Sequence, residues 1–265
     1  MWLDANDRKL AQDRRLLIAV LGALVALAWV VLWAWGRSPY SRLLSHELLA
    51  EAGERGTPEG AALALALVPG WTLMLVAMML PTSLPLVGLF HSLVRGRPHR
   101  ARLVALLVAG YLGVWTLFGV IAHAGDFALH RMVERIPWLE ARPWVIGASV
   151  LVLAGAYQFT RLKYRCLDQC RSPLSFITQH WRGRDEAWHS LALGVHHGLF
   201  CLGCCWSLML LMFAVGVGNL GWMLLLGTVM AVEKNVPWGK RISRPLGFAL
   251  VGLGTAAVLS AWPVA

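Results

Sequence analysis

Residues 16–35 form an uninterrupted apolar run, LLIAVLGALVALAWVVLWAW, that follows a charged segment directly. At about 1.5 Å of rise per residue, a helix of this length crosses the roughly 30 Å hydrocarbon core of a bilayer. The run is too long for the apolar core of a signal peptide and no small-residue cleavage site follows it, so we expect a retained anchor helix. Because a backbone in lipid must satisfy its own hydrogen bonds, few folds are open to such a chain.

The composition of the whole chain also favours a membrane protein. Hydrophobic residues make up 58% of the chain and charged residues 14%, whereas soluble domains carry about a quarter charged residues. The 14 tryptophans fit this class, since tryptophan gathers at membrane interfaces. A formal net charge of +10 would suit a nucleic-acid ligand, but the basic residues lie between the apolar runs. We therefore expect a lipid bilayer, and no nucleic acid, as partner.

Further apolar runs predict an all-α, polytopic transmembrane helix bundle of about seven helices. The bundle is expected to be one membrane domain over residues 1–265, with spans at 16–35, 70–90, 103–124, 143–160, 190–215, 219–235 and 245–262. Outer loops are expected at 36–69 and 125–142, and an inner loop at 161–188. Residues 61–69 are apolar and are either a short interfacial helix or part of the second span.

The basic residues predict the orientation of this bundle. Most of the 24 lysines and arginines lie before the first span, around residues 95–102, within 161–188 and within 234–244. Because lysine and arginine collect on the cytoplasmic side, this distribution predicts an N-terminus inside and a C-terminus outside. An odd number of spans follows from that orientation.

Three of the five cysteines lie in the stretch HHGLFCLGCCW, residues 196–206. On a helix His197, Cys201 and Cys204 share one face, Cys205 lies beside that stripe and His196 points elsewhere. Thiolate and imidazole groups ligate zinc, copper and iron, and soft sulfur favours Cu(I). The stretch therefore predicts part of a metal site that other spans complete. The alternative is packing, because free cysteine is a small buried hydrophobe that suits close helix contacts.

The second and sixth spans offer further candidate ligands. Pro81 lies inside the second span, where proline removes a helix hydrogen bond and predicts a kink. Met74 and Met78 share a face there; their thioethers suit Cu(I), or else they fill the core. Glu233 ends the sixth span and either pairs with Lys234 or orients a histidine from outside the metal's own ligand set.

Cys166 and Cys170 lie four residues apart in the expected inner loop. In a reducing cytosol such thiols indicate metal binding or redox chemistry rather than a structural disulfide. They either receive metal from the cytosol and pass it inward, or are simply reduced thiols.

Four longer motifs carry a resemblance to a known family. They are AMMLP (77–81), YQFTRLKYRCLDQCRSP (157–173), CLGCCWSLMLLMFAVGVGNLGWM (201–223) and EKNVPWG (233–239). Together they resemble a bacterial family of uncharacterised, predicted metal-binding integral membrane proteins. The resemblance implies a multi-pass protein of the bacterial cytoplasmic (inner) membrane that handles a metal ion, and it fixes no metal or reaction.

Three functions are open at this point. The first is binding of a soft transition metal, with copper favoured and zinc or iron as alternatives, for handling or delivery together with a metal-donor or metal-acceptor protein. The second is a membrane redox or assembly subunit using thiols, metal or haem. The third is a structural subunit with packing cysteines. No carboxylate pair, nucleophile triad or phosphate-binding loop is evident, so we do not expect an ordinary hydrolase or ATPase.

Overall fold

The computed structural model describes residues 2–37, 58–181, 185–216 and 219–261, and the regular structure within these ranges is helical throughout. The helices are α1 (Trp2–Gly36), α3 (Pro58–Met78), α4 (Leu80–Leu93), α5 (Arg100–Val133), α6 (Pro137–Glu140), α7 (Trp144–Tyr157), α8 (Arg161–Arg171), α9 (Pro173–His180), α10 (Glu186–Val215), α11 (Leu220–Asn235), the 3₁₀ turn η2 (Gly239–Ile242) and α12 (Ser243–Ala261). The predicted all-α class is confirmed.

Four of these helices are long and apolar enough to cross a bilayer, and up to six spans result if each of two bent helix pairs counts as one. The four are Arg15–Gly36, Arg100–Val133, Glu186–Ala214 and Gly239–Ala261, and the bent pairs are α3–α4 and α7–α8. Helix α11 has 16 residues, fewer than the roughly 20 that a span perpendicular to the bilayer needs. Seven spans and the orientation of the termini stay predictions.

Several segments expected as loops are helical. Residues 38–57 of the first expected loop lie outside the described residues, but α3 begins at Pro58 and makes 61–69 part of one helix with the second span. Helix α5 continues to Val133 into the expected loop 125–142. The expected loop 161–188 holds α8, α9 and the start of α10. Hydropathy marks only the stretches that suit lipid, whereas a helix continues until its hydrogen-bond ladder is interrupted.

The predicted kink in the second span is confirmed as a break. Helix α3 ends at Met78, α4 begins at Leu80, and the two axes are bent by 67°. Pro81 has no N–H for the helix ladder. Around the break the Met79 carbonyl accepts hydrogen bonds from Thr82 Oγ1 at 2.8 Å and from the Tyr111 hydroxyl at 3.2 Å.

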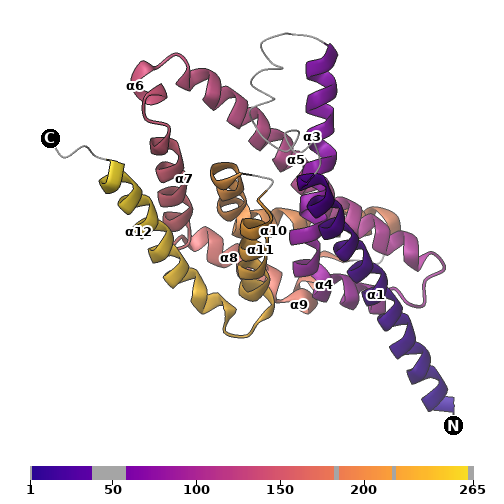
Figure 1. Ribbon diagram of the computed structural model, residues 1–265. Coiled ribbons are helices and arrows are strands. Elements are labelled where there is room, and N and C mark those ends of the chain that lie inside the picture. The colour runs from indigo at the N-terminus through magenta and orange to yellow at the C-terminus, as the bar shows by residue number, and fades with distance from the viewer. Residues whose placement is uncertain (1, 38–57, 182–184, 217–218, 262–265) are drawn as a thin grey trace.

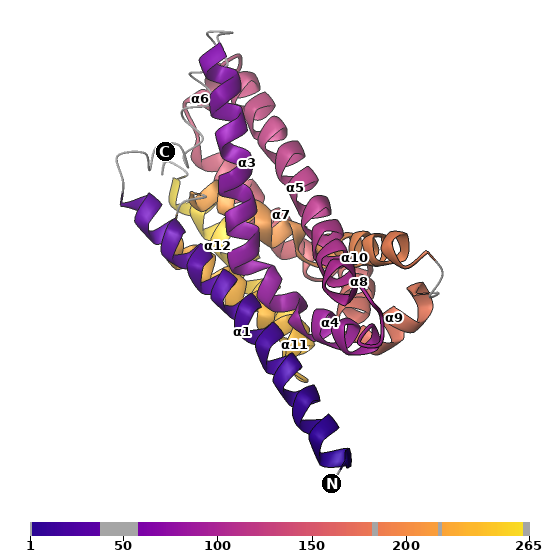
Figure 2. The same cartoon turned by 90° about the vertical axis from the view of Figure 1, so that its right-hand side faces the viewer.

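Close helix crossings place α10 at the centre of the fold. It packs against α5, where a Cβ added at Gly194 would collide with the Leu107 carbonyl. Helix α12 packs against α7 in the same manner, and the two lie side by side on one flank (Figure 1). Helix α1 runs along the outside of the bundle against α3 (Figure 2). Small residues allow backbones to approach closely, as is common between membrane helices.

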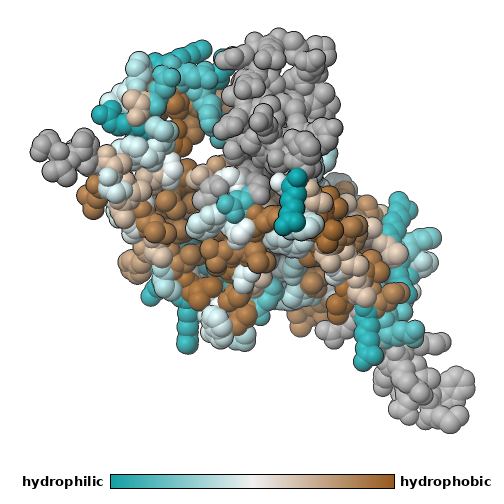
Figure 3. Space-filling model, viewed as in Figure 1, coloured by the Kyte–Doolittle hydropathy of each residue, from teal (hydrophilic) through white to brown (hydrophobic). Residues whose placement is uncertain are grey.

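The outer surface is strongly apolar. Large hydrophobic side chains are exposed on α1, α5 and α12, among them Leu27, Val30, Leu117, Ile121, Phe248 and Leu259. Figure 3 shows hydrophobic residues across the middle of one face and hydrophilic residues gathered towards its edges. Monomeric soluble proteins rarely expose apolar patches of more than a few hundred Å².

Candidate functional site

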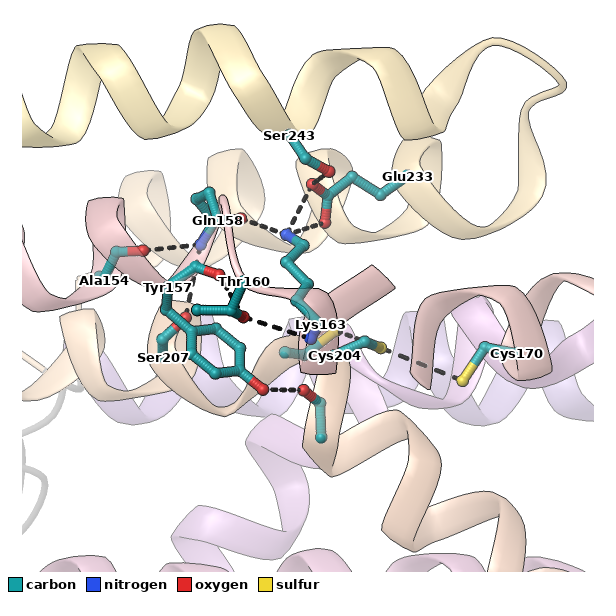
Figure 4. A network of polar contacts seen from close by, with 12 residues as sticks. Ala154, Tyr157, Gln158, Thr160, Lys163, Cys170, Cys204, Ser207, Glu233 and Ser243 are labelled. Carbon is teal, nitrogen blue, oxygen red and sulfur yellow. Dashed lines mark hydrogen bonds and ion pairs between the residues drawn. The ribbon is translucent and has the colours of Figure 1, made fainter. Parts of the chain in front are cut away.

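Four cysteine side chains converge inside the bundle, three from α10 and one from α8. Cys201, Cys204 and Cys205 are buried, and Cys170 of α8 is half-buried. The Sγ atoms of Cys204 and Cys205 are 3.3 Å apart, and those of Cys204 and Cys170 are 4.0 Å apart. Figure 4 shows Cys170 and Cys204 facing each other. The Cys204 thiol also donates a hydrogen bond to the Cys201 carbonyl oxygen at 3.1 Å. These four residues are called the thiol cluster below.

A buried lysine contacts the thiol cluster. Lys234 Nζ donates hydrogen bonds to Cys201 Sγ at 2.9 Å and to Thr82 Oγ1 at 3.1 Å. The Tyr111 hydroxyl lies 3.1 Å from the same sulfur. Among the described residues no carboxylate is within ion-pair distance of Lys234, although buried charges are normally paired. An ammonium group stabilises negative charge on a neighbouring sulfur, and the thiolate is the form of cysteine that binds metals.

The α3–α4 break lies beside this cluster. Thr82 and Tyr111, which both contact the Met79 carbonyl at the break, also reach Lys234 and Cys201 respectively. The break is therefore linked to Lys234 through Thr82 and to the Cys201 thiol through Tyr111.

His197 and His196 diverge, as their helical positions predict. His197 is buried, its Nε2 lies 3.3 Å from Ser83 Oγ, and its ring stacks on Tyr111 with centroids 5.4 Å apart. Its Nδ1 has no hydrogen-bond partner among the described residues. His196 is exposed, and its ring lies 5.0 Å from that of His180 on α9.

The two methionines of the second span are buried in the same apolar core as the α10 thiols. Met74 is 1% exposed and Met78 2% exposed, and both belong to the cluster that contains Cys201 and Cys204. Met78 also packs against Gly227 of α11.

Glu233 forms neither of the contacts that its sequence position suggested. Its carboxylate accepts hydrogen bonds from Lys163 Nζ at 2.8 and 2.9 Å and from Ser243 Oγ at 2.6 Å. Figure 4 shows Lys163 between Glu233 and the side chain of Gln158, to which it also donates a hydrogen bond. Since consecutive helix residues are about 100° apart, Glu233 faces α8 and α12 while Lys234 faces the thiols.

Cys166 and Cys170 lie on a helix, not in a loop, and they separate in the fold. Both are on α8, which packs against α10. Cys170 joins the thiol cluster, whereas the Cys166 sulfur fills the space above Gly203. Sequence reasoning missed Tyr111 as a neighbour of Cys201 and Thr82 as a neighbour of Lys234, because tertiary packing alone brings α4 and α5 there.

Comparison with known families adds a second kind of observation. The copper chaperone family PpoB2 matches residues 68–257. The chain belongs to this family. The match includes α4 to α11 and with them all five cysteines. No curated protein and no solved structure matches the chain.

The donor atoms fit the cargo of a copper chaperone. Thiolate and thioether sulfur select Cu(I) over harder ions, and Cu(I) is stable with as few as two sulfur ligands. In the part of the chain that the structure describes, no group of three or more His, Cys, Asp or Glu side chains is arranged to hold a metal ion. The thiols instead contact each other in pairs, which suits an ion of low coordination number.

Proposed function

We propose that this chain is an integral membrane copper chaperone that holds Cu(I) as cargo on the thiol cluster. The observation that carries the proposal is the convergence of four thiols, from α8 and α10, beside Lys234 in a member of a copper chaperone family. Cys204 and Cys201 are the central ligands, because Cys204 contacts both Cys170 and Cys205, and Cys201 lies beside the ammonium group of Lys234.

The surface supports a location in a lipid bilayer. Four to six helices have the length and composition of membrane spans, and exposed apolar side chains cover α1, α5 and α12. The family resemblance supports the bacterial cytoplasmic membrane, and the basic residues support an N-terminus inside. In this proposal residues 1–265 form one membrane domain, and the seventh span is α11.

The other candidate residues take different roles around the thiols. The Nδ1 of buried His197, which has no hydrogen-bond partner among the described residues, is available as an intermediate ligand. The thioethers of Met74 and Met78 give soft sulfur within the same core. Cys166 packs against Gly203, and Glu233 is bound to Lys163, so both support the fold rather than the metal.

Delivery requires only ligand exchange at the metal. A donor or acceptor protein adds its own sulfur or nitrogen ligand to a two-sulfur Cu(I) unit, and one of the chain's thiolates then leaves. No electron is transferred, and the open coordination positions of the ion make the exchange possible.

Copper binding by cysteine variants tests the proposal. The purified protein is loaded anaerobically in detergent with Cu(I) in competition with a chelator, and bound copper is measured after desalting. We expect the double variant Cys201→Ser/Cys204→Ser to lose the copper that wild type retains. Cys166→Ser is the matched control and should retain it. Equal copper in the double variant and wild type would reject the thiol cluster as the binding site.

A further inference from the structure

Two histidines face each other on the surface, away from the thiol cluster. His180 ends α9 and His196 lies on α10, with ring centroids 5.0 Å apart and planes tilted by 44°. His196 is exposed and His180 is half-buried. Thr178 and Gln179, just before His180, are also exposed. The pair therefore lies at the surface, next to polar side chains of α9.

One ring of the pair is held in a ligand-ready orientation. His180 Nδ1 lies 2.9 Å from the Phe176 carbonyl oxygen, and the His180 ring stacks on Phe176 with centroids 4.4 Å apart. A ring nitrogen that bonds a carbonyl oxygen carries the proton, so Nε2 keeps its lone pair for a metal. Phe176 is fully buried, which fixes the orientation of the imidazole.

The spacing of the two rings suits a shared metal ion. Imidazole nitrogen binds transition metals at about 2.0–2.1 Å, so two rings on one tetrahedral ion have centroids roughly 5 Å apart. The centroids of His180 and His196 are 5.0 Å apart. Two protein ligands leave the remaining coordination positions open, as a site that passes its metal onward requires.

A line of aromatic side chains leads from this pair to the thiols. Phe176, which stacks on His180, also contacts the ring of His197 with centroids 5.6 Å apart. His197 stacks on Tyr111, whose hydroxyl is 3.1 Å from Cys201 Sγ. The buried His197 Nδ1, without a partner among the described residues, thus lies between the surface pair and the cluster.

We infer that His180 and His196 form a surface copper site that loads the thiol cluster through His197. This inference rests on the proposed function, because it assigns the place where the cargo is taken up. The buried thiols hold copper, and the surface imidazoles capture it from the donor.

Loading kinetics of the double variant His180→Gln/His196→Gln test the inference. The variant is mixed anaerobically with chelated Cu(I), and copper–thiolate absorbance is followed with time. We expect loading to slow on the order of tenfold, the usual effect of losing metal-supporting groups, with the final absorbance unchanged. Titration should also show that the variant binds one copper ion fewer per chain than wild type. His189→Gln is the matched control, because His189 lies on the same helix and contacts Trp181 instead of the pair.

Chemical labelling of histidines in the wild-type protein is a second test, and it does not depend on whether a variant folds. Diethyl pyrocarbonate is applied with and without Cu(I), and modified histidines are identified by mass spectrometry. Copper should protect His180 and His196 but not His189. Equal labelling with and without copper, or loading of the double variant at the rate of His189→Gln, would overturn the surface site. The proposed function stands in that case if Cys201→Ser/Cys204→Ser still loses copper.

Discussion

Glu233 and Lys234 are neighbours on α11, yet they enter two buried polar regions of opposite character. Around Glu233 the charges are matched, since Lys163 Nζ donates to both carboxylate oxygens and Ser243 adds a further hydrogen bond. Around Lys234 the partners are a thiol and the Thr82 hydroxyl. The first region is an ion pair completed within the protein, and the second is a cation beside sulfur.

The difference separates a structural network from the proposed binding site. Matched buried charges hold α7, α8, α11 and α12 together through Gln158, Lys163, Glu233 and Ser243. Beside the thiol region, the buried His197 Nδ1 has no hydrogen-bond partner among the residues that the structure describes. Buried polar groups without partners are uncommon in native proteins and call for a ligand or a function.

The largest effect on stability is expected from Lys163→Met. Both side chains of the Lys163–Glu233 pair are almost fully buried, at 0% and 1% exposed. Removing the lysine leaves an uncompensated carboxylate, which destabilises a protein by about 3–5 kcal/mol. Thermal unfolding in detergent measures the change. Lys240→Met is the control, because it breaks the exposed pair with Asp168 and should lower the unfolding free energy by at most about 1 kcal/mol. An equal loss of unfolding free energy in Lys163→Met and Lys240→Met would contradict the structural role of the buried ion pair.

A smaller loss of unfolding free energy is expected from Gly194→Ala, which tests the packing of α10, the helix that carries three of the four thiols. The added methyl group would collide with the Leu107 backbone carbonyl where α10 crosses α5. Overpacking of this kind destabilises by about 1–3 kcal/mol. Gly88→Ala meets open space on α4 and should raise stability slightly, by up to about 1 kcal/mol. A Gly194→Ala protein that unfolds like Gly88→Ala would show that α10 does not need this close contact.

The smallest effect on stability is expected from Lys234→Met, although this lysine is buried like Lys163. No carboxylate is left without a partner, so the unfolding free energy should stay within about 1 kcal/mol of wild type. Affinity for Cu(I) should fall on the order of tenfold, because a two-thiolate Cu(I) unit is an anion that loses its neighbouring cation. Chelator competition measures the affinity. Unchanged affinity together with a large loss of stability would make Lys234 structural, like Lys163.

Local sequence patterns predicted the features that depend on one helix at a time. Apolar runs indicated the helical class, Pro81 indicated the α3–α4 break, and helical spacing indicated the common face of Cys201 and Cys204. Cys170 was a candidate ligand from the sequence, but its contact with Cys204 was not predictable in this way, because α8 is rich in charged residues and follows a 65° bend. Hydropathy therefore suggested a loop.

The directions of Glu233 and Lys234 show a second limit of sequence reasoning. Adjacent opposite charges suggested a local pair, but helical geometry points them to different neighbours. Which neighbours they meet depends on how α8, α10 and α12 pack around α11. Such tertiary contacts leave no local signal in the sequence.

X-ray absorption at the copper edge, recorded on protein loaded with substoichiometric Cu(I), tests the central claim most directly. The thiol cluster predicts a first coordination shell of sulfur in wild type and in Cys166→Ser, and loss of that sulfur shell in Cys201→Ser/Cys204→Ser. A first shell of nitrogen or oxygen alone in wild type, unchanged in the double variant, would contradict copper binding by these thiols.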